Sequence, residues 1–246
     1  MQGRYLRLPS PALERDVHLW TYGHFGMPVI AFPTAAGFAH EWQSQGMVDV
    51  LAPLIQSGKI KLYCPESNVA ETFTRQEADP AWRISRYTAY ERFVHDTLVP
   101  FVRDDCRSRD IRIAAVGASL GGLYAANMAL KSPDTFWWSL CLSGRYEIRG
   151  FLNGHDDLET YLHNPLAYAY NLSGDALQRV RERTSLTLVC GQGLWEEGCI
   201  EETQELGALL AHKGVKVHTD IWGRDVKHDW IWWKRQALHH IRSRFA

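Results

Sequence analysis

The 246-residue sequence has no apolar run of the roughly 18 residues that a membrane-spanning helix needs. Its first residues, MQGRYLRLPSPALERD, also lack the apolar segment and cleavage pattern of a secretory signal. Basic residues number 27 and acidic residues 28, so no excess charge points to a nucleic acid or an anionic membrane as partner. We therefore expect a soluble, cytoplasmic protein that binds neither nucleic acid nor membrane.

Cysteine is scarce as well, with five residues in the chain and no pair at the spacing of a zinc site. Cys64, Cys141 and Cys190 lie inside or at the end of apolar, strand-like runs, so we expect buried free thiols. The glycine patterns that hold phosphate groups, Gly-x-Gly-x-x-Gly and Gly-Lys-Ser/Thr, are also missing. We expect no cofactor and no metal.

One stretch of residues, 111–133, combines a strand, a glycine-bounded turn and a helix in the sequence IRIAAVGASLGGLYAANMALKSP. The apolar run at its start is typical of a parallel strand that is buried on both faces. Gly117, Ser119 and Gly121 follow in the pattern Gly-x-Ser-x-Gly, and helical spacing then continues to Pro133. In this context the pattern is a nucleophile elbow, which holds a serine hydroxyl beside free N–H groups at a helix N-terminus. The sequence predicts that Ser119 is a nucleophile.

Strands and helices alternate along the rest of the chain, which predicts a mostly parallel sheet of about eight strands with helices on both faces. We expect one α/β domain over residues 1–246, with an irregular insertion at about 145–184 over the active site, whose helical pieces lie near Leu158 and Leu177. The expected strands cover residues 4–8, 17–22, 28–32, 61–64, 111–116, 136–142, 185–190 and 215–222, and the main helices cover 47–55, 86–102, 123–132, 200–212 and 230–245.

A nucleophilic serine needs a base, and the base needs a carboxylate that orients it. In sheets of this type these groups follow the carboxyl ends of strands, in the chain order serine, acid, histidine. His228 lies between the last strand and the last helix and is the expected base; a capping or surface histidine is the alternative. The loop after residues 185–190 offers two adjacent acids, of which we take Glu197 as first choice and Glu196 as the alternative.

Two backbone N–H groups are expected to stabilise the charge that develops on a substrate carbonyl oxygen. Leu120 supplies one because it follows the nucleophile, and Ala35 supplies the other from the loop after Phe32, unless that loop is a plain connection. Aromatic residues are expected to wall the pocket, which favours an acyl or aryl ester. These substrate-binding candidates are Phe38, Trp42 and Trp195, together with the loop 70–75 and the insertion 145–184.

Three segments resemble one known family of α/β-hydrolases: VGASLGG around Ser119, WEEG after the strand 185–190, and the ending WGRDVKHDWIWW. The family is that of the esterases related to esterase D (S-formylglutathione hydrolase), feruloyl esterases, enterochelin esterases and the mycolyl-transferring antigens. The resemblance implies the α/β-hydrolase fold, with Ser119 as nucleophile, His228 as base and Leu120 and Ala35 as oxyanion donors.

Two departures from the family pattern bear on the acid and on the oxyanion loop. Many members carry an aspartate three residues after the strand-ending glycine, where this chain has Leu194, so Glu196 or Glu197 has to supply the acid. The strand before the oxyanion loop ends in Phe-Pro-Thr-Ala instead of an Asp-Gly-like turn.

The function that we predict is a serine carboxylesterase that acts on a small-molecule ester through an acyl-enzyme. An acyltransferase or a peptidase would use the same three side chains, and a non-catalytic binding member of the fold is the alternative from another class. The sequence leaves open the natural ester, whether the chain forms a homo-oligomer, and whether the insertion moves as a lid.

Overall fold

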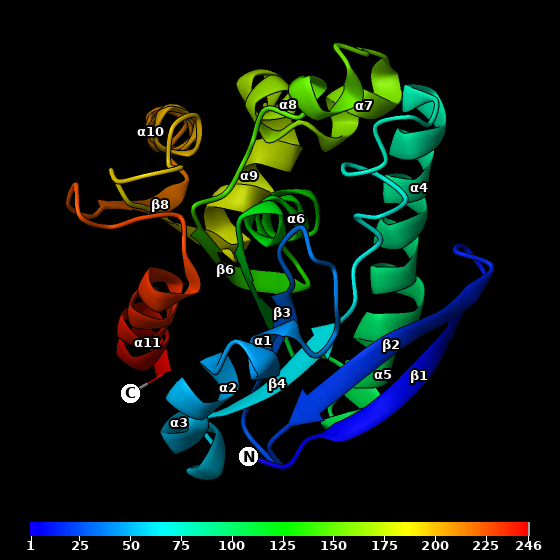
Figure 1. Cartoon of the computed structure of the whole chain (residues 1–246), viewed down its shortest axis with the longest axis vertical. Helices are drawn as coiled ribbons and strands as arrows, with labels where there is room; N and C mark the ends of the chain where they lie inside the picture. Colours follow the sequence, from blue (N-terminus) through cyan, green and yellow to red (C-terminus); the bar gives the residue numbers. More distant parts are fainter. Residues whose placement is uncertain (246) are drawn as a thin grey trace.

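A computed structural model describes residues 1–245 as one eight-stranded sheet with helices packed on both of its faces (Figure 1). The strand order is β1-β2-β4-β3-β5-β6-β7-β8. The strands are β1 (Arg4–Ser10), β2 (Arg15–Tyr22), β3 (Met27–Phe32), β4 (Ile60–Pro65), β5 (Ile113–Ala118), β6 (Phe136–Leu142), β7 (Ser185–Cys190) and β8 (Lys216–Ile221).

The sheet is antiparallel at one end and parallel over the rest. β1 pairs antiparallel with β2, and β2 pairs antiparallel with β4. From β4 onward every neighbouring pair is parallel, so the carboxyl ends of six strands meet at one rim. The mostly parallel sheet of about eight strands is therefore confirmed.

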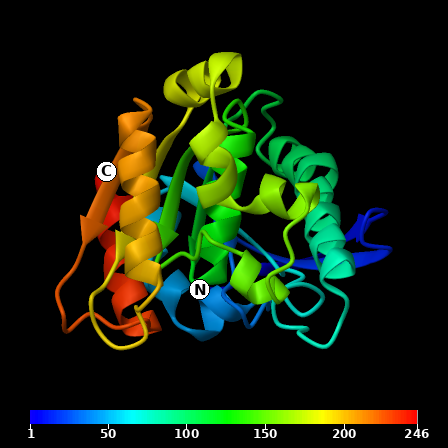
Figure 2. The ribbon, with the colours of Figure 1, turned by 90° about the horizontal axis from the view of Figure 1, so that it is seen from above.

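The helices and the short helical turns all follow β3 in the chain, where they lie between successive strands and after β8 (Figures 1 and 2). They are α1 (Glu41–Ser44), α2 (Met47–Val50), α3 (Ala52–Gln56), α4 (Pro80–Phe93), the π-helical turn η1 (Val94–Leu98), α5 (Val99–Asp105), α6 (Leu120–Lys131), the 3₁₀ turn η2 (Arg149–Leu152), α7 (Leu158–His163), α8 (Pro165–Asn171), α9 (Gly174–Arg183), α10 (Cys199–His212) and α11 (Trp230–Phe245).

Alternate residues of β5 show that the sheet is covered on both faces. Ile113 and Ala115 belong to one apolar core, which they share with α4, α5, α6 and α10. Ala114, Val116 and Ala118 belong to a second core, which they share with α2, α3 and α11. Because successive side chains of a strand point to opposite faces, a fully apolar strand fits this double cover.

Two expected helices differ in detail from the sequence prediction. The helix expected at 47–55 is divided into α2 and α3, which meet at Leu51 and Ala52. The helix expected at 86–102 starts earlier, at Pro80, where the Asp79 side chain accepts a hydrogen bond from Trp82 N at 2.9 Å. It then runs through a π-helical turn that ends two residues before Pro100, which has no N–H to donate to the preceding turn of a helix.

The segment 145–184 connects β6 to β7 and is more helical than we expected. It contains η2 and three helices, of which α7 and α9 match the helical pieces expected near residues 158 and 177. The sequence did not indicate α8, Pro165–Asn171, which follows α7 after a single residue, Asn164.

Two further expectations, about membrane-spanning helices and about the cysteines, can be compared with residues 1–245. Within this range no helix combines the length and the apolar character that a bilayer crossing requires. The five cysteines are free, and Cys64, Cys141 and Cys190 are buried, as expected.

Candidate active site

The turn between β5 and α6 holds Ser119 in a conformation that few residues adopt. Ser119 has φ 55° and ψ −124°, outside the usual regions for a residue with a side chain. A Cβ on Gly117 would lie 2.1 Å from the carbonyl oxygen of Gly121. A Cβ on Gly121 would lie 2.6 Å from the carbonyl oxygens of Phe32 and Pro33. Neither position therefore has room for a side chain. The strained turn presents the serine hydroxyl at the start of α6.

Two loops from other strands bring a histidine and a glutamate to Ser119. His228, between β8 and α11, places Nε2 3.0 Å from Ser119 Oγ. Its Nδ1 lies 3.2 Å from Oε2 of Glu196, in the loop between β7 and α10. The ring also packs edge-on against Trp233, with centroids 4.8 Å apart. An Nδ1–H that donates to Glu196 leaves Nε2 free to accept the proton of Ser119.

Glu196 lies in an almost fully buried site, where hydrogen-bond donors surround its carboxylate. It is 1% exposed. Oε1 accepts from Ser143 Oγ at 2.7 Å and from Gly191 N at 3.3 Å, and Oε2 accepts from Cys190 Sγ at 3.3 Å. Buried carboxylates are costly unless they are bonded in this way.

The first choice for the acid, Glu197, does not meet His228. The side chain of Glu197 is exposed and lines the mouth of the cavity, whereas Glu196 faces inward. Trp195, directly before the pair, has φ 66°, so the backbone turns sharply at this point. The expectation is corrected: of the two adjacent glutamates, the structure brings Glu196 to the histidine.

Sequence reasoning missed Ser143, which contacts the acid from the end of β6. It has a positive φ of 47°, and its N–H donates to Val189 O at 2.7 Å. Its hydroxyl donates to Glu196 and accepts from Trp233 Nε1 at 3.0 Å. A polar residue directly after a buried strand is the signal that could have found it, because the carboxyl ends of parallel strands meet at the site.

The two expected oxyanion donors lie on the same cavity as Ser119. Ala35 and Leu120 both line it. Neither backbone N–H donates a hydrogen bond among the turn, loop and cap contacts of residues 1–245. Leu120 is the first residue of α6, so its N–H has no partner within the helix.

A second buried carboxylate, Glu41, holds the loop that contains Ala35. Glu41 is 4% exposed and accepts hydrogen bonds from Thr34 N at 2.7 Å and Thr34 Oγ1 at 2.6 Å. Burial raises the pKa of the Glu41 carboxyl, and the hydrogen bonds from Thr34 and the nearby His40 offset only part of this effect. The sequence indicated no role for Glu41.

The cavity at Ser119 has a volume of about 370 Å³. Trp195 lines it, as expected, and is 66% exposed. Side chains from the loop after β4 and from the segment 145–184 complete the wall, also as expected. The lining residues are Ala35, Phe73, Thr74, Gln76, Ser119, Leu120, Arg145, Phe151, Trp195, Glu197, Cys199 and His228.

Two of the three aromatic residues expected in this wall lie elsewhere. Trp42 is 1% exposed; its Nε1 donates to Phe32 O at 3.1 Å and its ring packs edge-on against Trp230. It is therefore a core residue beneath the oxyanion loop. Phe38 is 58% exposed, stacks on His40 and falls outside the set of residues in 1–245 that line the cavity.

A cation in the cavity wall, Arg145, was also not expected. Its Nε and Nη2 donate to Glu202 Oε1 at 2.9 and 2.7 Å, and its guanidinium lies over the ring of Phe151. Burial alone would lower the pKa of Arg145, but the hydrogen bonds and charge of Glu202 raise it. The guanidinium therefore stays charged in the cavity wall, where it is paired with Glu202.

Cys199 lines the same cavity, with Sγ 3.8 Å from Nδ1 of His228. Burial raises the pKa of the Cys199 thiol to about 12, so the thiol is protonated at neutral pH. It does not form the thiolate that a competing nucleophile would require.

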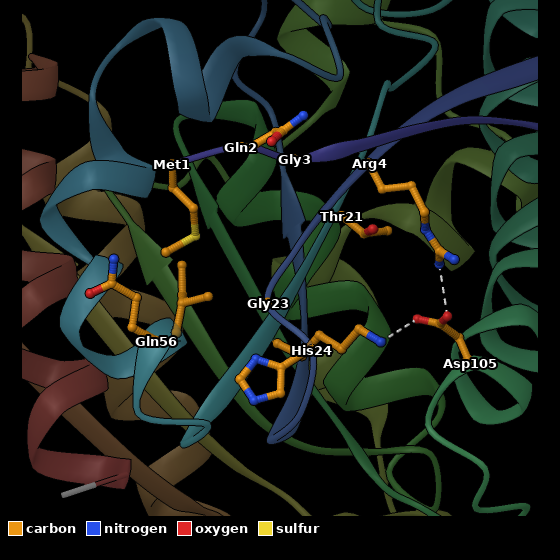
Figure 3. A pocket seen from close by; sticks show the side chains of 11 residues that line it. Met1, Gln2, Gly3, Arg4, Thr21, Gly23, His24, Gln56 and Asp105 are labelled. Carbon is orange, nitrogen blue, oxygen red and sulfur yellow. Dashed lines mark hydrogen bonds and ion pairs between the residues drawn. The ribbon is translucent and has the colours of Figure 1, made fainter.

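A larger cavity, of about 570 Å³, lies near the N-terminus and contains none of these groups (Figure 3). Its charged side chains pair with one another: Arg4 Nη2 lies 2.7 Å from Asp105 Oδ1, and Lys61 Nζ lies 2.6 Å from Asp105 Oδ2. Burial alone would raise the pKa of Asp105. Hydrogen bonds from Lys61, Tyr63 and Arg4 lower it by more than burial raises it, so the pKa lies below its ordinary value. The chemistry of nucleophile, base and acid is confined to the smaller cavity.

Comparisons with solved structures agree with this architecture. A ferulic acid esterase superposes with a TM-score of 0.74 at 18% identity, covering 97% of this chain and 95% of that one. An S-formylglutathione hydrolase from Agrobacterium tumefaciens gives 0.72 at 14% identity, with 100% and 99% covered. FphF, a fluorophosphonate-binding serine hydrolase of Staphylococcus aureus, gives 0.73 at 12% identity, with 100% of both chains covered. At these identities the likeness shows the α/β-hydrolase fold.

A comparison with curated proteins gave no match.

A match to a family model shows the family of the chain in addition to its fold. The family model described as "Putative esterase" matches residues 16–244, which include the elbow, the acid loop and the histidine loop. The chain therefore belongs to this esterase family and is a carboxylic ester hydrolase.

Proposed function

We propose that the protein hydrolyses small-molecule carboxylic esters through a covalent acyl-enzyme. Ser119 is the nucleophile, His228 the general base and Glu196 the acid that orients the histidine. The observation that carries the proposal is the continuous chain of contacts from Ser119 Oγ to His228 Nε2 at 3.0 Å and from His228 Nδ1 to Glu196 Oε2 at 3.2 Å.

In the first step Ser119 Oγ attacks the ester carbonyl carbon while its proton moves to His228 Nε2. The imidazole then carries a positive charge, which the buried carboxylate of Glu196 stabilises through Nδ1–H. Because Ser143 and Gly191 already bond the other oxygen of Glu196, the carboxylate keeps its orientation during the step.

The negative charge that forms on the carbonyl oxygen needs donors that are already in place. Leu120 N–H and Ala35 N–H are free and line the cavity beside Ser119. One such donor typically contributes about 3 kcal/mol to the transition state. The proton on His228 then passes to the departing alcohol, and a water molecule, activated by the same histidine, hydrolyses the acyl-enzyme.

The cavity favours a compact acyl or aryl group. Its volume of about 370 Å³ is near the lower end for small-molecule sites, and Phe73, Phe151 and Trp195 supply aromatic surface. In a series of p-nitrophenyl esters, kcat/KM should therefore be higher for acetate and benzoate than for long-chain esters. A preference that rises steadily with chain length would contradict this size limit.

Labelling with a fluorophosphonate followed by mass spectrometry tests the proposal. The proposal requires a single adduct on Ser119, which is lost in Ser119→Ala and strongly reduced in His228→Ala. His239→Ala, which changes an exposed histidine of α11, is the matched control and should label like the wild type. A folded wild-type protein that takes up no label and leaves p-nitrophenyl acetate intact would overturn the proposal.

A further inference from the structure

The last strand and the last helix bring two histidines and an aspartate together at the end of the sheet. His218 and Asp220 are two residues apart on β8, so their side chains point to the same face of the strand. Thr219, between them, points to the opposite face, where its Oγ1 lies beside Gly207 of α10. Figure 1 shows α10 and α11 on either side of β8. His240 of α11 completes the group, which we call the β8–α11 cluster (His218, Asp220 and His240).

The ligand atoms of the three side chains converge. Each side chain contributes one nitrogen or oxygen, and these three atoms all lie within 4.8 Å of one another. His240 Nε2 is 3.0 Å from Asp220 Oδ2, and the ring centroids of His218 and His240 are 6.0 Å apart. Trp222 Nε1 donates to the same carboxylate at 2.8 Å and fixes its orientation, as outer hydrogen bonds do around metal ligands.

The three side chains of the β8–α11 cluster differ in exposure to solvent. His240 is 8% exposed and Asp220 is partly buried, so two of the three side chains are held by packing. His218 is exposed, and it lies on β8, the last strand in the order of the sheet. Two groups are therefore fixed, and the third can rotate toward an incoming ion.

We propose that His218, Asp220 and His240 bind a divalent transition-metal ion, for which Zn²⁺ is the best match. Two imidazoles and one carboxylate are ligands that zinc accepts, at about 2.0–2.2 Å, whereas Mg²⁺ and Ca²⁺ prefer oxygen ligands. Tetrahedral coordination at that length needs ligand atoms roughly 3.3 Å apart. His240 and Asp220 already approach this spacing, and His218 needs only a side-chain rotation.

The ion would join β8 to α11, the two elements that flank the loop carrying His228. Its role is structural, because the three ligands belong to none of the groups that line the cavity at Ser119. An ion that binds the folded chain and not the unfolded chain raises the melting temperature, and the rise grows with the logarithm of the ratio of ion concentration to dissociation constant. The proposal is therefore independent of esterase activity.

A second set of side chains could compete for the ion and has to be distinguished. Glu196, Cys199 and His228 also bring ligand atoms within 4.8 Å of one another. That set contains a thiol, which the β8–α11 cluster lacks. Co²⁺ bound through a thiolate shows an intense charge-transfer band, whereas Co²⁺ bound by nitrogen and oxygen shows only weak d–d bands.

The experiment is a titration of the full chain with Zn²⁺, followed by calorimetry and by the melting temperature. The wild type should bind Zn²⁺ and melt at a higher temperature when the ion is present. His218→Ala should bind at least about tenfold more weakly, because it removes a direct ligand, and should lose most of the rise. His212→Ala is the matched control, since His212 is an exposed histidine at the end of α10 and outside the cluster, and it should behave like the wild type. Cys199→Ser should also keep the rise.

Three outcomes would overturn the proposal. They are no measurable binding by the wild type, equal binding by the wild type and His218→Ala, and loss of binding in Cys199→Ser together with a thiolate band from Co²⁺. His218 is exposed, so its replacement leaves the fold intact and the comparison stays decisive. His240→Asn, which alters the buried ligand, should weaken binding to a similar degree if the variant remains folded.

Discussion

Two buried carboxylates support the two sides of the candidate active site in different ways. Besides two nearby donors, Cys190 and Gly191, Glu196 contacts Ser143 and His228, which come from segments far away in the chain. Glu41 receives both of its bonds from Thr34, seven residues earlier. The acid side is therefore assembled by tertiary packing, whereas the oxyanion side is held by a local loop.

The two carboxylates also differ in the charge of their partners. Glu196 faces an imidazole that takes up a proton during the proposed reaction, so its charge is used in the transition state. Glu41 faces an N–H and a hydroxyl that stay neutral, and burial raises its pKa above the ordinary value. We infer that Glu196 acts on the reaction through His228, whereas Glu41 acts through the position of the loop around Ala35.

The largest effect should come from removing the charge on the acid side. Glu196→Gln should lower kcat for p-nitrophenyl acetate by about 10⁴-fold, because the histidine loses its partner and its preferred tautomer. Glu197→Gln changes the exposed neighbour and should keep kcat within about twofold of the wild type. Equal losses of kcat in both variants would show that Glu196 and Glu197 do not differ in role as we propose.

A smaller effect should follow from the same change on the oxyanion side. Glu41→Gln removes one of the two acceptors that hold Thr34, so the loop around Ala35 should shift. Loss of one oxyanion donor costs about 10²- to 10³-fold, and a displaced donor should cost less, about 10- to 100-fold in kcat.

The affinity for a trifluoromethyl ketone, which mimics the tetrahedral intermediate, separates a shifted donor from a general loss of structure. In Glu41→Gln this affinity should fall in parallel with kcat, while KM stays close to the wild-type value. An unchanged affinity would mean that Glu41 does not position the oxyanion loop.

Removing the hydroxyl that supports Glu196 should have a weaker effect than removing the carboxylate. Ser143→Ala removes the hydrogen bond to Glu196, worth about 1 to 2 kcal/mol, so kcat should fall about tenfold; it also removes the acceptor of Trp233 Nε1. KM should not change, because Ser143 is buried and lies outside the set of residues in 1–245 that line the cavity.

Ser143→Gly serves as the matched variant for Ser143→Ala. It also lacks the hydroxyl but adopts the positive φ without strain. The two variants should therefore differ in melting temperature and share the same loss of kcat. Wild-type kcat in Ser143→Gly would mean that backbone strain, and not the hydrogen bond, explains the loss in Ser143→Ala.

The smallest effects concern the pH dependence of stability, for which Glu91 provides a contrast to Glu41. Burial raises the pKa of Glu41, so its contribution to stability is complete below about pH 4.3 and is lost as the pH rises through the folded-state pKa. Burial alone would raise the pKa of Glu91, but His163 and Lys131 lower it. Its contribution is present above about pH 4.3 and is lost as the pH falls.

Urea denaturation from about pH 4 to about pH 8 checks these opposite signs. The difference in midpoint between the wild type and Glu41→Gln should shrink with rising pH, and the difference between the wild type and Glu91→Gln should grow. The same direction in both pairs would contradict the contrast.

The sequence predicted the fold well where burial alone determines the structure. The strands expected at 136–142 and 185–190 are β6 and β7 to the residue, because continuous apolar runs fit a sheet that is covered on both faces. The chain order of serine, acid loop and histidine loop likewise predicted the two loops that meet Ser119. Ser119 and His228 could be predicted without tertiary information, because each follows the end of a strand in the sequence.

The features that the sequence did not predict depend on how loops turn. Glu196 and Glu197 are chemically identical neighbours, and only the backbone conformation at Trp195 decides which one faces His228. Trp42 follows the oxyanion loop in sequence, but packing against Trp230 directs it into the core. Contacts of this kind join residues far apart in the chain and leave no local pattern.

The contact between Gly121 and the end of β3 has a consequence for the width of the oxyanion site. One proposed donor belongs to the helix that contains Gly121, and the other, Ala35, lies two residues after Pro33. The spacing between the two donors is therefore fixed by how closely two backbones approach, and a single hydrogen atom on Gly121 sets that limit. Any side chain there would widen the gap without touching the nucleophile, the base or the acid.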